Sequence, residues 1–362
     1  MAAKHILTII ESLEGGGVER VALRLAGLWA ASGRRVTILA GSLNGPLAAE
    51  IPAGVDIIER GSSRYGALAF ALPGAIRKLR PDIFFCPGNY YSAIAVAARL
   101  YLGGECPPII CQISNAFERK DYNAAQQAGY TAWLRFHTHW INHFVALSGA
   151  MRLEAMAVAR IRPENISVIP NPAPPPRTAP LADTEQPAAP MVLGVGRLRP
   201  QKRFHLLVEA FARVNHPDAE LVILGEGPER RRIEAAADRF GVSRSFSLPG
   251  YTADPLSWMG RAHVTALSSV FEGVPNVLRE SLSVGTPVVS TACSSAIGEI
   301  VTCPELGSIV PVDDVEALAQ AIAARLAAQP DRKAIAAISS NPTAAAAGHD
   351  YLEVMDALLR NI

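Results

Sequence analysis

Short apolar runs alternate with longer helical patterns along this chain, stop at a cluster of prolines, and then start again. Such an alternation is typical of a parallel sheet covered by helices. The strands expected before the prolines are 5–10, 35–40, 55–59, 83–86, 109–113, 144–147 and 166–169. Those expected after them are 191–195, 219–224, 245–248, 264–267, 287–290 and 308–310. The pattern predicts an α/β protein with two doubly wound domains that face each other across a cleft.

Between the two series, the prolines of residues 170–190 cannot continue a helix or a central strand, so we expect a semi-rigid linker at 171–190. This linker separates a first domain, residues 1–170, from a second domain, residues 191–345. A C-terminal helix in residues 346–362 is expected to pack back on the first domain. Helical patterns occur at 17–32, 66–79, 91–102, 151–159, 317–326 and 351–359.

Bulk composition limits the class of protein. A chain of 362 residues suits two domains, and its net charge of +1 argues against a dedicated nucleic-acid binder. Its five cysteines include no C-x-x-C pair, which favours buried thiols in a reducing compartment. The apolar run at 5–10 is too short for a signal peptide, and no stretch approaches the roughly 20 apolar residues of a membrane span. We therefore expect a cytoplasmic protein.

The most informative motif is the segment 269–280, SVFEGVPNVLRE, which places Glu272 and Glu280 on either side of an expected helix start. Pro275 suits the first helical turn, and Gly285 suits the end of the helix. Free backbone N–H groups at such a start can hold a phosphate. With a carboxylate on each side to accept sugar hydroxyls, the segment predicts a nucleotide-sugar site.

Three other loops carry glycines or fixed charges directly after expected strands. Arg197 and Lys202 follow the strand at 191–195, where an arginine can hold a diphosphate bidentately and a lysine adds a compact charge. The sequence GEGP at 225–228 suits either the wall of a base pocket or an ordinary strand-to-helix turn. The glycines at 15–17 open the first helix, where they allow an anion to approach, but a plain turn explains them equally well.

A metal site is not expected. His139 and His143 are spaced one helical turn apart, but no carboxylate or cysteine joins them at ligand spacing, which favours a partly buried helix at 135–143. The chain contains no Asp-x-Asp pair to hold a divalent cation against a diphosphate. We therefore predict that the protein is metal-independent and needs no cofactor.

Seven short motifs follow one another along the chain: GGVE (16–19), VALS (145–148), VIPNP (168–172), GRL (196–198) with Lys202, LGEGP (224–228), the block from Glu272 to Glu280, and GTPVVST (285–291). Together they resemble the retaining, nucleotide-sugar-dependent glycosyltransferases of family four, also called group 1, over nearly the whole chain. The resemblance implies the GT-B fold, in which two Rossmann-like domains bind the acceptor and the donor. It also implies a hexosyltransferase that moves a sugar from a nucleoside-diphosphate sugar, with UDP favoured, to a carbohydrate or lipid-linked acceptor in polysaccharide biosynthesis.

The resemblance implies roles at the matching positions. Arg197 and Lys202 would neutralise the leaving diphosphate, as a metal does in other enzymes. Glu272, grouped with them as catalytic, would bind hydroxyls of the donor sugar, and Glu280 the ribose hydroxyls. The remaining donor-binding positions would be Gly16, Gly17, Gly227, Gly273, Val274, Pro275, Asn276 and Val277. Retention in this family is ascribed to attack on the same face helped by the departing phosphate, so no protein nucleophile is required.

The chain departs from the family pattern in the first domain. Many members carry a histidine after the strand at 109–113, where this chain has the acceptor-side candidates Ser114 and Asn115. Asn115 can donate a hydrogen bond but cannot act as a general base. A second departure is His143, where an acidic residue often stands, and we interpret it as structural.

Other interpretations remain open from the residues alone. Glycoside hydrolysis also uses two carboxylates, but the nearby cations argue against it. A sugar-nucleotide epimerase on the same fold and a non-catalytic nucleotide-binding module are the alternatives. Peripheral contact with the inner face of the cell membrane is a further expectation, based on Arg64, Arg77, Lys78, Arg80, Arg135, Phe136 and Trp140. The sequence indicates neither the sugar, the base, the acceptor nor the oligomeric state.

Overall fold

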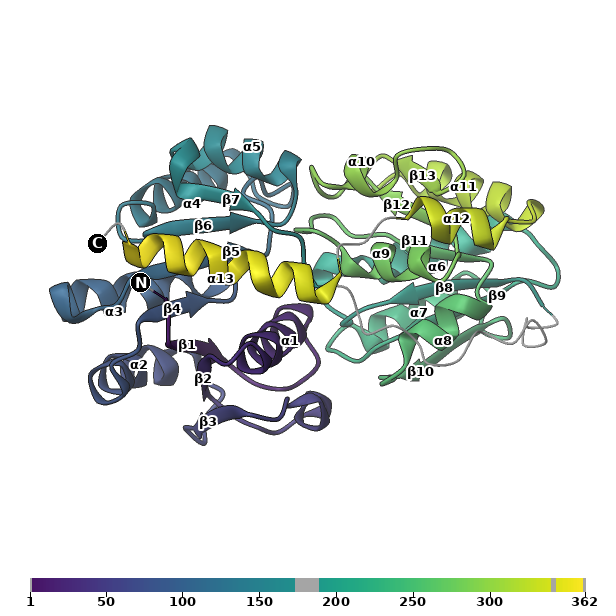
Figure 1. Cartoon of the computed structure of the whole chain (residues 1–362). Coiled ribbons are helices and arrows are strands. Elements are labelled where there is room, and N and C mark those ends of the chain that lie inside the picture. Colours follow the sequence, from purple (N-terminus) through teal and green to yellow (C-terminus); the bar gives the residue numbers. More distant parts are fainter. Residues whose placement is uncertain (1, 173–188, 340–342, 361–362) are drawn as a thin grey trace. The chain divides into compact units, whose positions relative to one another are not determined.

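The computed structural model describes residues 2–172, 189–339 and 343–360. Backbone contacts divide the chain into two compact units. The first unit contains residues 1–173 and 342–362, and the second contains residues 174–341. Most of the linker expected at 171–190 lies outside the described residues. The C-terminal segment therefore belongs to the unit that holds the N-terminus (Figure 1).

A seven-stranded parallel sheet forms the centre of the first unit, in the order β3-β2-β1-β4-β5-β6-β7 (Figure 1). All the expected strands are confirmed, with ends that differ by at most one residue. Strands β1 and β4 are buried throughout, which explains why they appear in the sequence as continuous apolar runs. The strands are β1 (His5–Ile10), β2 (Arg35–Ala40), β3 (Val55–Glu59), β4 (Ile83–Cys86), β5 (Ile109–Ile113), β6 (His143–Ala146) and β7 (Ile166–Val168).

Helices connect these strands. The four helices expected from periodic patterns are confirmed, and α4, which overlaps the helix expected at 135–143 only at its end, begins at a capping box between Asn123 and Gln126. The α-helices are α1 (Gly17–Ala31), α2 (Tyr65–Leu79), α3 (Ser92–Leu102), α4 (Ala124–His137) and α5 (Gly149–Ala159). Short 3₁₀ turns lie between them, at η1 (Pro46–Glu50), η2 (Asn89–Tyr91), η3 (Gly103–Glu105) and η4 (Pro163–Asn165).

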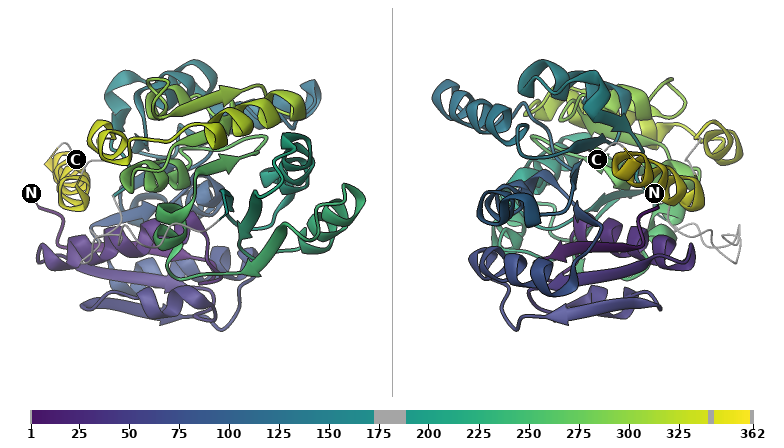
Figure 2. Two further views of the ribbon diagram at one scale, coloured as in Figure 1. Left: turned by 90° about the vertical axis from the view of Figure 1, so that its right-hand side faces the viewer. Right: turned by 60° about the vertical axis from the view of Figure 1, so that its left-hand side comes forward.

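The last helix, α13 (Ala344–Arg360), completes the core of the first unit. It lies against α1 (Figures 1 and 2) and begins two residues before the segment 346–362 in which a C-terminal helix was expected. Tyr351 is fully buried against the rings of Trp29 and Phe85. Its hydroxyl accepts a 2.9 Å hydrogen bond from Nε2 of Gln112, which also bonds Oδ1 of Asn171 at 3.1 Å. One buried amide of β5 therefore connects α13 to the segment that leads out of the unit.

The second unit is built on a six-stranded parallel sheet in the order β10-β9-β8-β11-β12-β13. All six expected strands are confirmed, with ends that differ by at most two residues. They are β8 (Met191–Val195), β9 (Glu220–Leu224), β10 (Phe246–Gly250), β11 (Val264–Leu267), β12 (Val288–Thr291) and β13 (Gly307–Val310).

The helices of this unit are more numerous than the sequence pattern suggested. The expected helix at 317–326 is confirmed inside α11, and α9 is the helix expected after the loop of Glu272. The elements are η5 (Pro200–Lys202), α6 (Phe204–Val214), α7 (Arg230–Arg239), α8 (Pro255–Arg261), α9 (Asn276–Ser283), α10 (Ile297–Ile300), α11 (Val315–Ala327) and α12 (Arg332–Ile338). Within the described part of the chain, every helix is too short or too polar to cross a lipid bilayer.

Strand order fixes where ligands can bind in each unit. In the second sheet, successive strands are added on one side of β8 and then, from β11 onward, on the other side. The point between β8 and β11 is therefore a topological switch point, where loops leave in opposite directions and open a crevice at the carboxyl edge. The corresponding point in the first sheet lies between β1 and β4.

Candidate active site

An ion pair joins the two loops at the switch point of the second sheet. Nζ of Lys202, in η5 after β8, lies 2.6 Å from Oε1 of Glu272, in the loop after β11. Both side chains are largely shielded from solvent, with exposed fractions of 17% and 12%. The Ser269 hydroxyl donates a second hydrogen bond, at 2.7 Å, to the same carboxylate oxygen. Two residues that are far apart in the sequence are therefore in direct contact at the edge where ligands bind.

The main chain holds the two loops together around this pair. The backbone N–H of Val270 donates to the carbonyl of Gln201 at 2.9 Å, and Nε2 of Gln201 donates to the carbonyl of Phe271 at 2.8 Å. The Ser268 hydroxyl donates to the carbonyl of Lys202 at 2.8 Å. The position of Lys202 relative to the β11 loop is thus fixed by three hydrogen bonds in addition to its own ion pair.

Cys293 lies beneath Glu272 and was not singled out from the sequence. Its carbonyl accepts a 2.9 Å hydrogen bond from the backbone N–H of Glu272. Burial, together with the negative charge of Glu272, raises the pKa of the Cys293 thiol to about 12, so the thiol is neutral at physiological pH. This residue supports the loop by its backbone, and only the contact itself could have revealed it.

Helix α9 starts immediately after this loop and presents unoccupied donors. Pro275 precedes the helix in an extended conformation, with φ −74° and ψ 97°, so its expected place inside the first turn is wrong by one residue. In the described structure, the backbone N–H groups of Gly273, Val274 and Val277 donate to no acceptor. Such N–H groups at the positive end of a helix can bind an anion. The helix ends before Gly285, whose φ of +78° suits the expected stop.

Arg197 and Glu280 lie on either side of the Lys202–Glu272 pair in the sequence. Arg197 follows β8 directly, is exposed, and forms no ion pair with any residue that the structure describes. Its charge is therefore available to an anionic ligand, whereas that of Lys202 is already balanced by Glu272. Asn276 is the first residue of α9, and Glu280 lies in its second turn and is half-buried.

The GEGP segment forms a tight turn against the β8 loop. The backbone N–H of Leu198 donates to the carbonyl of Glu226 at 2.8 Å, and that of Glu229 donates to the carbonyl of Leu198 at 3.0 Å. Gly227 has a φ of +155°, and a Cβ atom there would collide with the carbonyl of Leu198. Glycine is therefore required at 227 by the backbone of this chain, whatever ligand the loop binds.

The glycines of the first unit lie after β1, at its switch point. Gly15 has a φ of +97°, Gly16 is the N-cap of α1, and Gly17 begins the helix. A Cβ atom at Gly17 would meet nothing within 4 Å, so the space beside this helix start is open. An anion role for this helix start, which carries Glu19 in its first turn, stays a prediction.

The two acceptor-side candidates after β5 differ in what they offer. The Ser114 hydroxyl donates to Oδ1 of Asn89 at 3.2 Å and lies against Gly88, in the loop after β4. Oδ1 of Asn115 accepts a 3.0 Å hydrogen bond from the backbone N–H of Ala116. Asn115 therefore uses its acceptor to stabilise its own turn, while Ser114 links the loops after β4 and β5.

The helix expected at 135–143 is wrong beyond residue 137. Helix α4 ends at His137, because the Thr138 hydroxyl and the His139 ring both bond the carbonyl of Arg135 and so replace the next helical N–H. His143 lies on β6, where Nε2 is 2.9 Å from the Ser167 hydroxyl. His139 and His143 are therefore not on one helical face.

Among the described residues, the three-residue clusters of potential metal ligands are limited to His349, Asp350 and Glu353, exposed on α13. None of them belongs to the switch point of the second sheet, and exposed acidic groups are common without an ion. Metal independence of the reaction stays a prediction.

Comparison with known proteins gives this geometry a context. The chain resembles the crystal structure of WaaG, a glycosyltransferase involved in lipopolysaccharide biosynthesis, with a TM-score of 0.75, 16% identity, and coverage of 97% of this chain and 99% of that one. Anabaena HepE in complex with UDP aligns with a TM-score of 0.69 and 16% identity, over 98% and 100% of the two chains. The two Rossmann-like units are thus those of the GT-B fold.

Sequence comparison identifies the family. Residues 15–177 match the model described as Glycosyltransferase Family 4, and residues 189–328 match the model described as Glycosyl transferases group 1. The chain belongs to this family of glycosyltransferases.

A curated relative is the N-acetylgalactosamine-N,N'-diacetylbacillosaminyl-diphospho-undecaprenol 4-alpha-N-acetylgalactosaminyltransferase of Campylobacter jejuni. It is 36% identical over 143 residues, which are 40% of this chain and 39% of the relative. The match thus spans well under half of the relative's length.

Acid should destabilise the first unit through His137. This residue is fully buried, and burial, opposed only in part by a backbone hydrogen bond to Trp133, lowers its pKa from 6.5 to about 4. The unfolded chain binds a proton near pH 6.5 and the folded chain does not, so stability is present above that pH and is lost as the pH falls toward 4. When the pH falls from neutral to about 4, the free energy of unfolding should drop by about 3 kcal/mol more in the parent than in His137→Leu. Urea denaturation at each pH measures this, and equal losses would contradict it.

The backbone requirement at Gly227 gives a second prediction. Gly227→Ala should lower the free energy of unfolding by at least about 2 kcal/mol, because the new Cβ both strains φ and strikes the Leu198 carbonyl. Gly298→Ala is the matched control in the same unit, since a Cβ there meets nothing within 4 Å, and we expect a change within about 1 kcal/mol. Urea denaturation followed by circular dichroism compares the two. Equal stabilities would show that the 225–228 turn rearranges freely.

Proposed function

We propose that the chain transfers a hexosyl group, with retention, from a nucleoside-diphosphate sugar to a carbohydrate or lipid-linked acceptor in cell-surface glycan synthesis. The observation that carries this proposal is the switch point of the second sheet. There Lys202 pairs with Glu272 in the loop after β11, and that loop leads to the unoccupied amides at the start of α9. A diphosphate needs donors and positive charge, and a sugar needs a carboxylate to accept its hydroxyls. This one crevice edge offers all three.

In the proposed reaction, the diphosphate binds the N–H groups of Gly273, Val274 and Val277 and the exposed guanidinium of Arg197. Phosphate oxygens near Lys202 compete with Glu272 for its ammonium group. Glu272 then has lone pairs free for the hydroxyls of the donor sugar, while Ser269 keeps it oriented. The acceptor hydroxyl attacks the anomeric carbon on the face from which the diphosphate leaves, and the leaving phosphate oxygen takes its proton. Glu280 binds the ribose hydroxyls.

For the base, we propose UDP. HepE was crystallised with UDP on the same fold, which supports this choice. The proposed lipid-linked acceptor is supported by the C. jejuni relative, whose name specifies a diphospho-undecaprenol substrate. The five free cysteines, four of them buried, support a reducing cytoplasmic compartment for the reaction.

The proposal is tested by incubating the protein with radiolabelled UDP- and GDP-sugars, with and without undecaprenyl-diphosphate-linked sugars. We expect label to move to the acceptor from the UDP-sugar, with the anomeric configuration retained. Epimerised donor without transfer would replace the proposal by an epimerase. Absence of donor binding, measured as no thermal shift with UDP, GDP or ADP, would overturn the site itself.

Charge at the leaving group should dominate the rate. Arg197→Ala or Lys202→Ala is expected to lower the turnover number by about 10²–10³, because each would remove one stabilising charge from the departing diphosphate. Arg199→Ala is the matched control, since Arg199 is exposed in the same loop, and its turnover should match that of the parent. Steady-state kinetics measures all three variants. Near-normal turnover in Arg197→Ala would refute its role.

Metal independence makes a separate prediction. Because the amides and cations of this site neutralise the diphosphate without a metal, transfer should continue at the same rate in excess EDTA. Loss of transfer that Mg²⁺ restores would show that a divalent cation belongs to the reaction. Donor binding measured in the same buffers separates a binding effect from a catalytic one.

A further inference from the structure

Arg230, the first residue of α7, uses every N–H group of its guanidinium within the protein. Nε and Nη2 donate to the two carboxylate oxygens of Glu226, at 3.2 and 2.7 Å. Nη1 donates to Oε1 of Glu234 at 3.0 Å, and Nη1 and Nη2 both donate to the carbonyl of Leu248 at 3.2 Å. A guanidinium has five N–H groups in a fixed fork, so these bonds leave none for a ligand. The side chain therefore connects parts of the protein to one another, and it was not singled out from the sequence.

The Leu248 carbonyl belongs to a β-bulge at the carboxyl end of β10. Ser247 of β10 pairs with Val222 of β9, and Gly250 pairs with Leu224. Three steps along β10 thus oppose two steps along β9, which leaves one extra residue in β10. A bulge bends the strand out of the ladder and is a recurrent feature beside active sites. Arg230 fixes this bulge through its carbonyl.

Backbone contacts join the bulge to the loops after β8 and β9. The N–H of Gly225 donates to the carbonyl of Gly250 at 2.8 Å, and the N–H of Gly196 donates to the carbonyl of Leu224 at 2.9 Å. Gly250 has a φ of +97°, and a Cβ atom there would lie 2.6 Å from Oε1 of Glu226. The three loops therefore meet closely at the carboxyl edge of the second sheet, where the candidate site lies.

A nucleotide whose diphosphate binds at the start of α9 has to extend its base along the same edge. On the β12 side, Cys293 lies beneath Glu272 and supports its loop by a backbone hydrogen bond. On the β9 side, the N–H groups of Glu226 and Gly227 donate to no acceptor among the residues that the structure describes. Bases carry carbonyl and ring-nitrogen acceptors along their edges, which such N–H groups can bind. The β9 side therefore suits the base better.

We propose that Arg230 is a positioning residue for the base of the donor nucleotide, a role that rests on the nucleotide-sugar site proposed above. Its planar fork holds the Glu226 carboxylate and the Leu248 carbonyl in a fixed relation. The N–H groups of residues 226 and 227 are thereby held in place against the bulge. Donors fixed in this way meet the base at hydrogen-bond distance and select between bases by the acceptors on their edges.

The charges around Arg230 favour positioning over stabilisation of the fold. In its ion pair with Glu226, the two side chains are 31% and 55% exposed. Ion pairs this exposed add little to stability. The carboxylates of Glu226 and Glu234 also balance the guanidinium charge, so Arg230 is not a further cation for the diphosphate.

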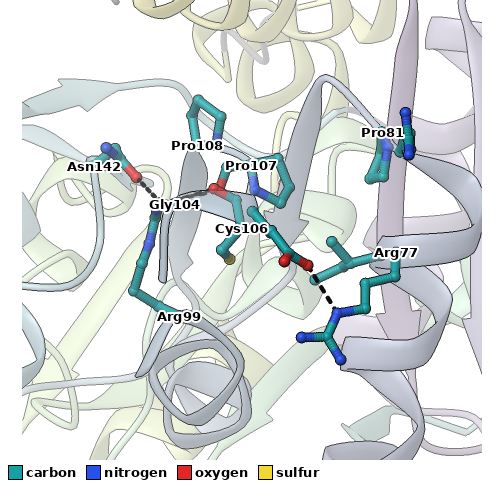
Figure 3. A pocket seen from close by; sticks show the side chains of 11 residues that line it. Arg77, Pro81, Arg99, Gly104, Cys106, Pro107, Pro108 and Asn142 are labelled. Atoms are coloured by element: carbon teal, nitrogen blue, oxygen red, sulfur yellow. Dashed lines mark hydrogen bonds and ion pairs between the residues drawn. The ribbon is translucent and has the colours of Figure 1, made fainter. Parts of the chain in front are cut away.

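Arg99 of the first unit offers a comparison, because it also donates mainly to backbone carbonyls. It bonds the carbonyls of Cys106 and Pro107 and Oδ1 of Asn142. These residues line a cavity of about 890 Å³ at the amino ends of β4 and β5 (Figure 3). Ligands of parallel sheets bind at the opposite, carboxyl edge. Arg99 therefore has a structural role of the same kind at an edge where no nucleotide is expected.

Isothermal calorimetry of the full chain with UDP, GDP, ADP and inorganic pyrophosphate tests this role. In Arg230→Met, the dissociation constant of the nucleotide that the parent binds most tightly should rise about tenfold, because the base loses well-placed partners. The dissociation constant of pyrophosphate, which has no base, should stay within about twofold of the parent's. Arg230→Lys keeps the charge but lacks the fork, so it should behave like Arg230→Met.

Two other arginines provide the controls. Arg232→Met removes a cation of the same helix that pairs with Glu229 at 3.1 Å, and it should bind all four ligands like the parent. Arg99→Met should lower the thermal midpoint, because its three hydrogen bonds are lost, without changing any dissociation constant. A purely structural role of Arg230 would give the result expected for Arg99→Met.

The positioning role is overturned if both Arg230 variants bind the nucleotide like the parent, or if their affinities for nucleotide and pyrophosphate fall equally. Full affinity in Arg230→Lys would also overturn it, since charge alone would then suffice. Each of these results leaves the nucleotide site of the parent intact. A parent that binds none of the three nucleotides would instead overturn the site itself, and the role of Arg230 with it.

Discussion

The contact between Lys202 and Glu272 connects two loops that the fold alone would leave independent. Each loop follows a different strand at the switch point of the second sheet, and each supplies part of the proposed diphosphate site. The ion pair and the hydrogen bonds between their backbones hold the two loops in position relative to each other. In the proposed reaction, such preorganisation lowers the reorganisation needed when a diphosphate enters, and Glu272 is the group that the phosphate must displace from Lys202. The pair thus holds the two loops together, and in the proposed reaction it is also the contact that the donor must break.

The sequence predicted the sheets better than the connections. Strands such as β1 and β8 are buried on both faces, so each leaves a continuous apolar run between turn residues. Helix α7 was missed because its sequence, RRRIEAAADR, is mostly polar and buries only a few residues. In α13 the periodic pattern covered only residues 351–359, because the alanines before them carry little periodic signal, although Ala347 and Gly348 are buried. In both helices, tertiary packing supplies what the local pattern does not show.

Within the candidate site, sequence reasoning chose the residues but could not predict their contacts. The pairing of Lys202 with Glu272 spans 70 positions in the chain and depends on the order of strands in the sheet. The role of Cys293 rests on its backbone carbonyl, which has no signature in residue type. The side-chain oxygen of Asn115 accepts a hydrogen bond from the next backbone N–H, and this local bond competes with a bond to a ligand. On α2 and α3, composition showed the basic residues, but only burial showed that Phe70, Leu100 and Tyr101 face outward.

Helix α13 has a consequence for the order in which the chain can fold. It contributes Ala347, Tyr351, Leu352 and Met355 to a core whose other buried members lie before residue 172, with the whole second unit between them in the chain. On the ribosome, the second unit is therefore complete before the first can close its core around Trp29. Until α13 emerges, the face of α1 that it contacts and the side-chain amide of Gln112 have no partner from that helix. The amino-terminal unit is thus made first but finished last, and it exposes apolar surface during synthesis for as long as the intervening unit takes to be translated.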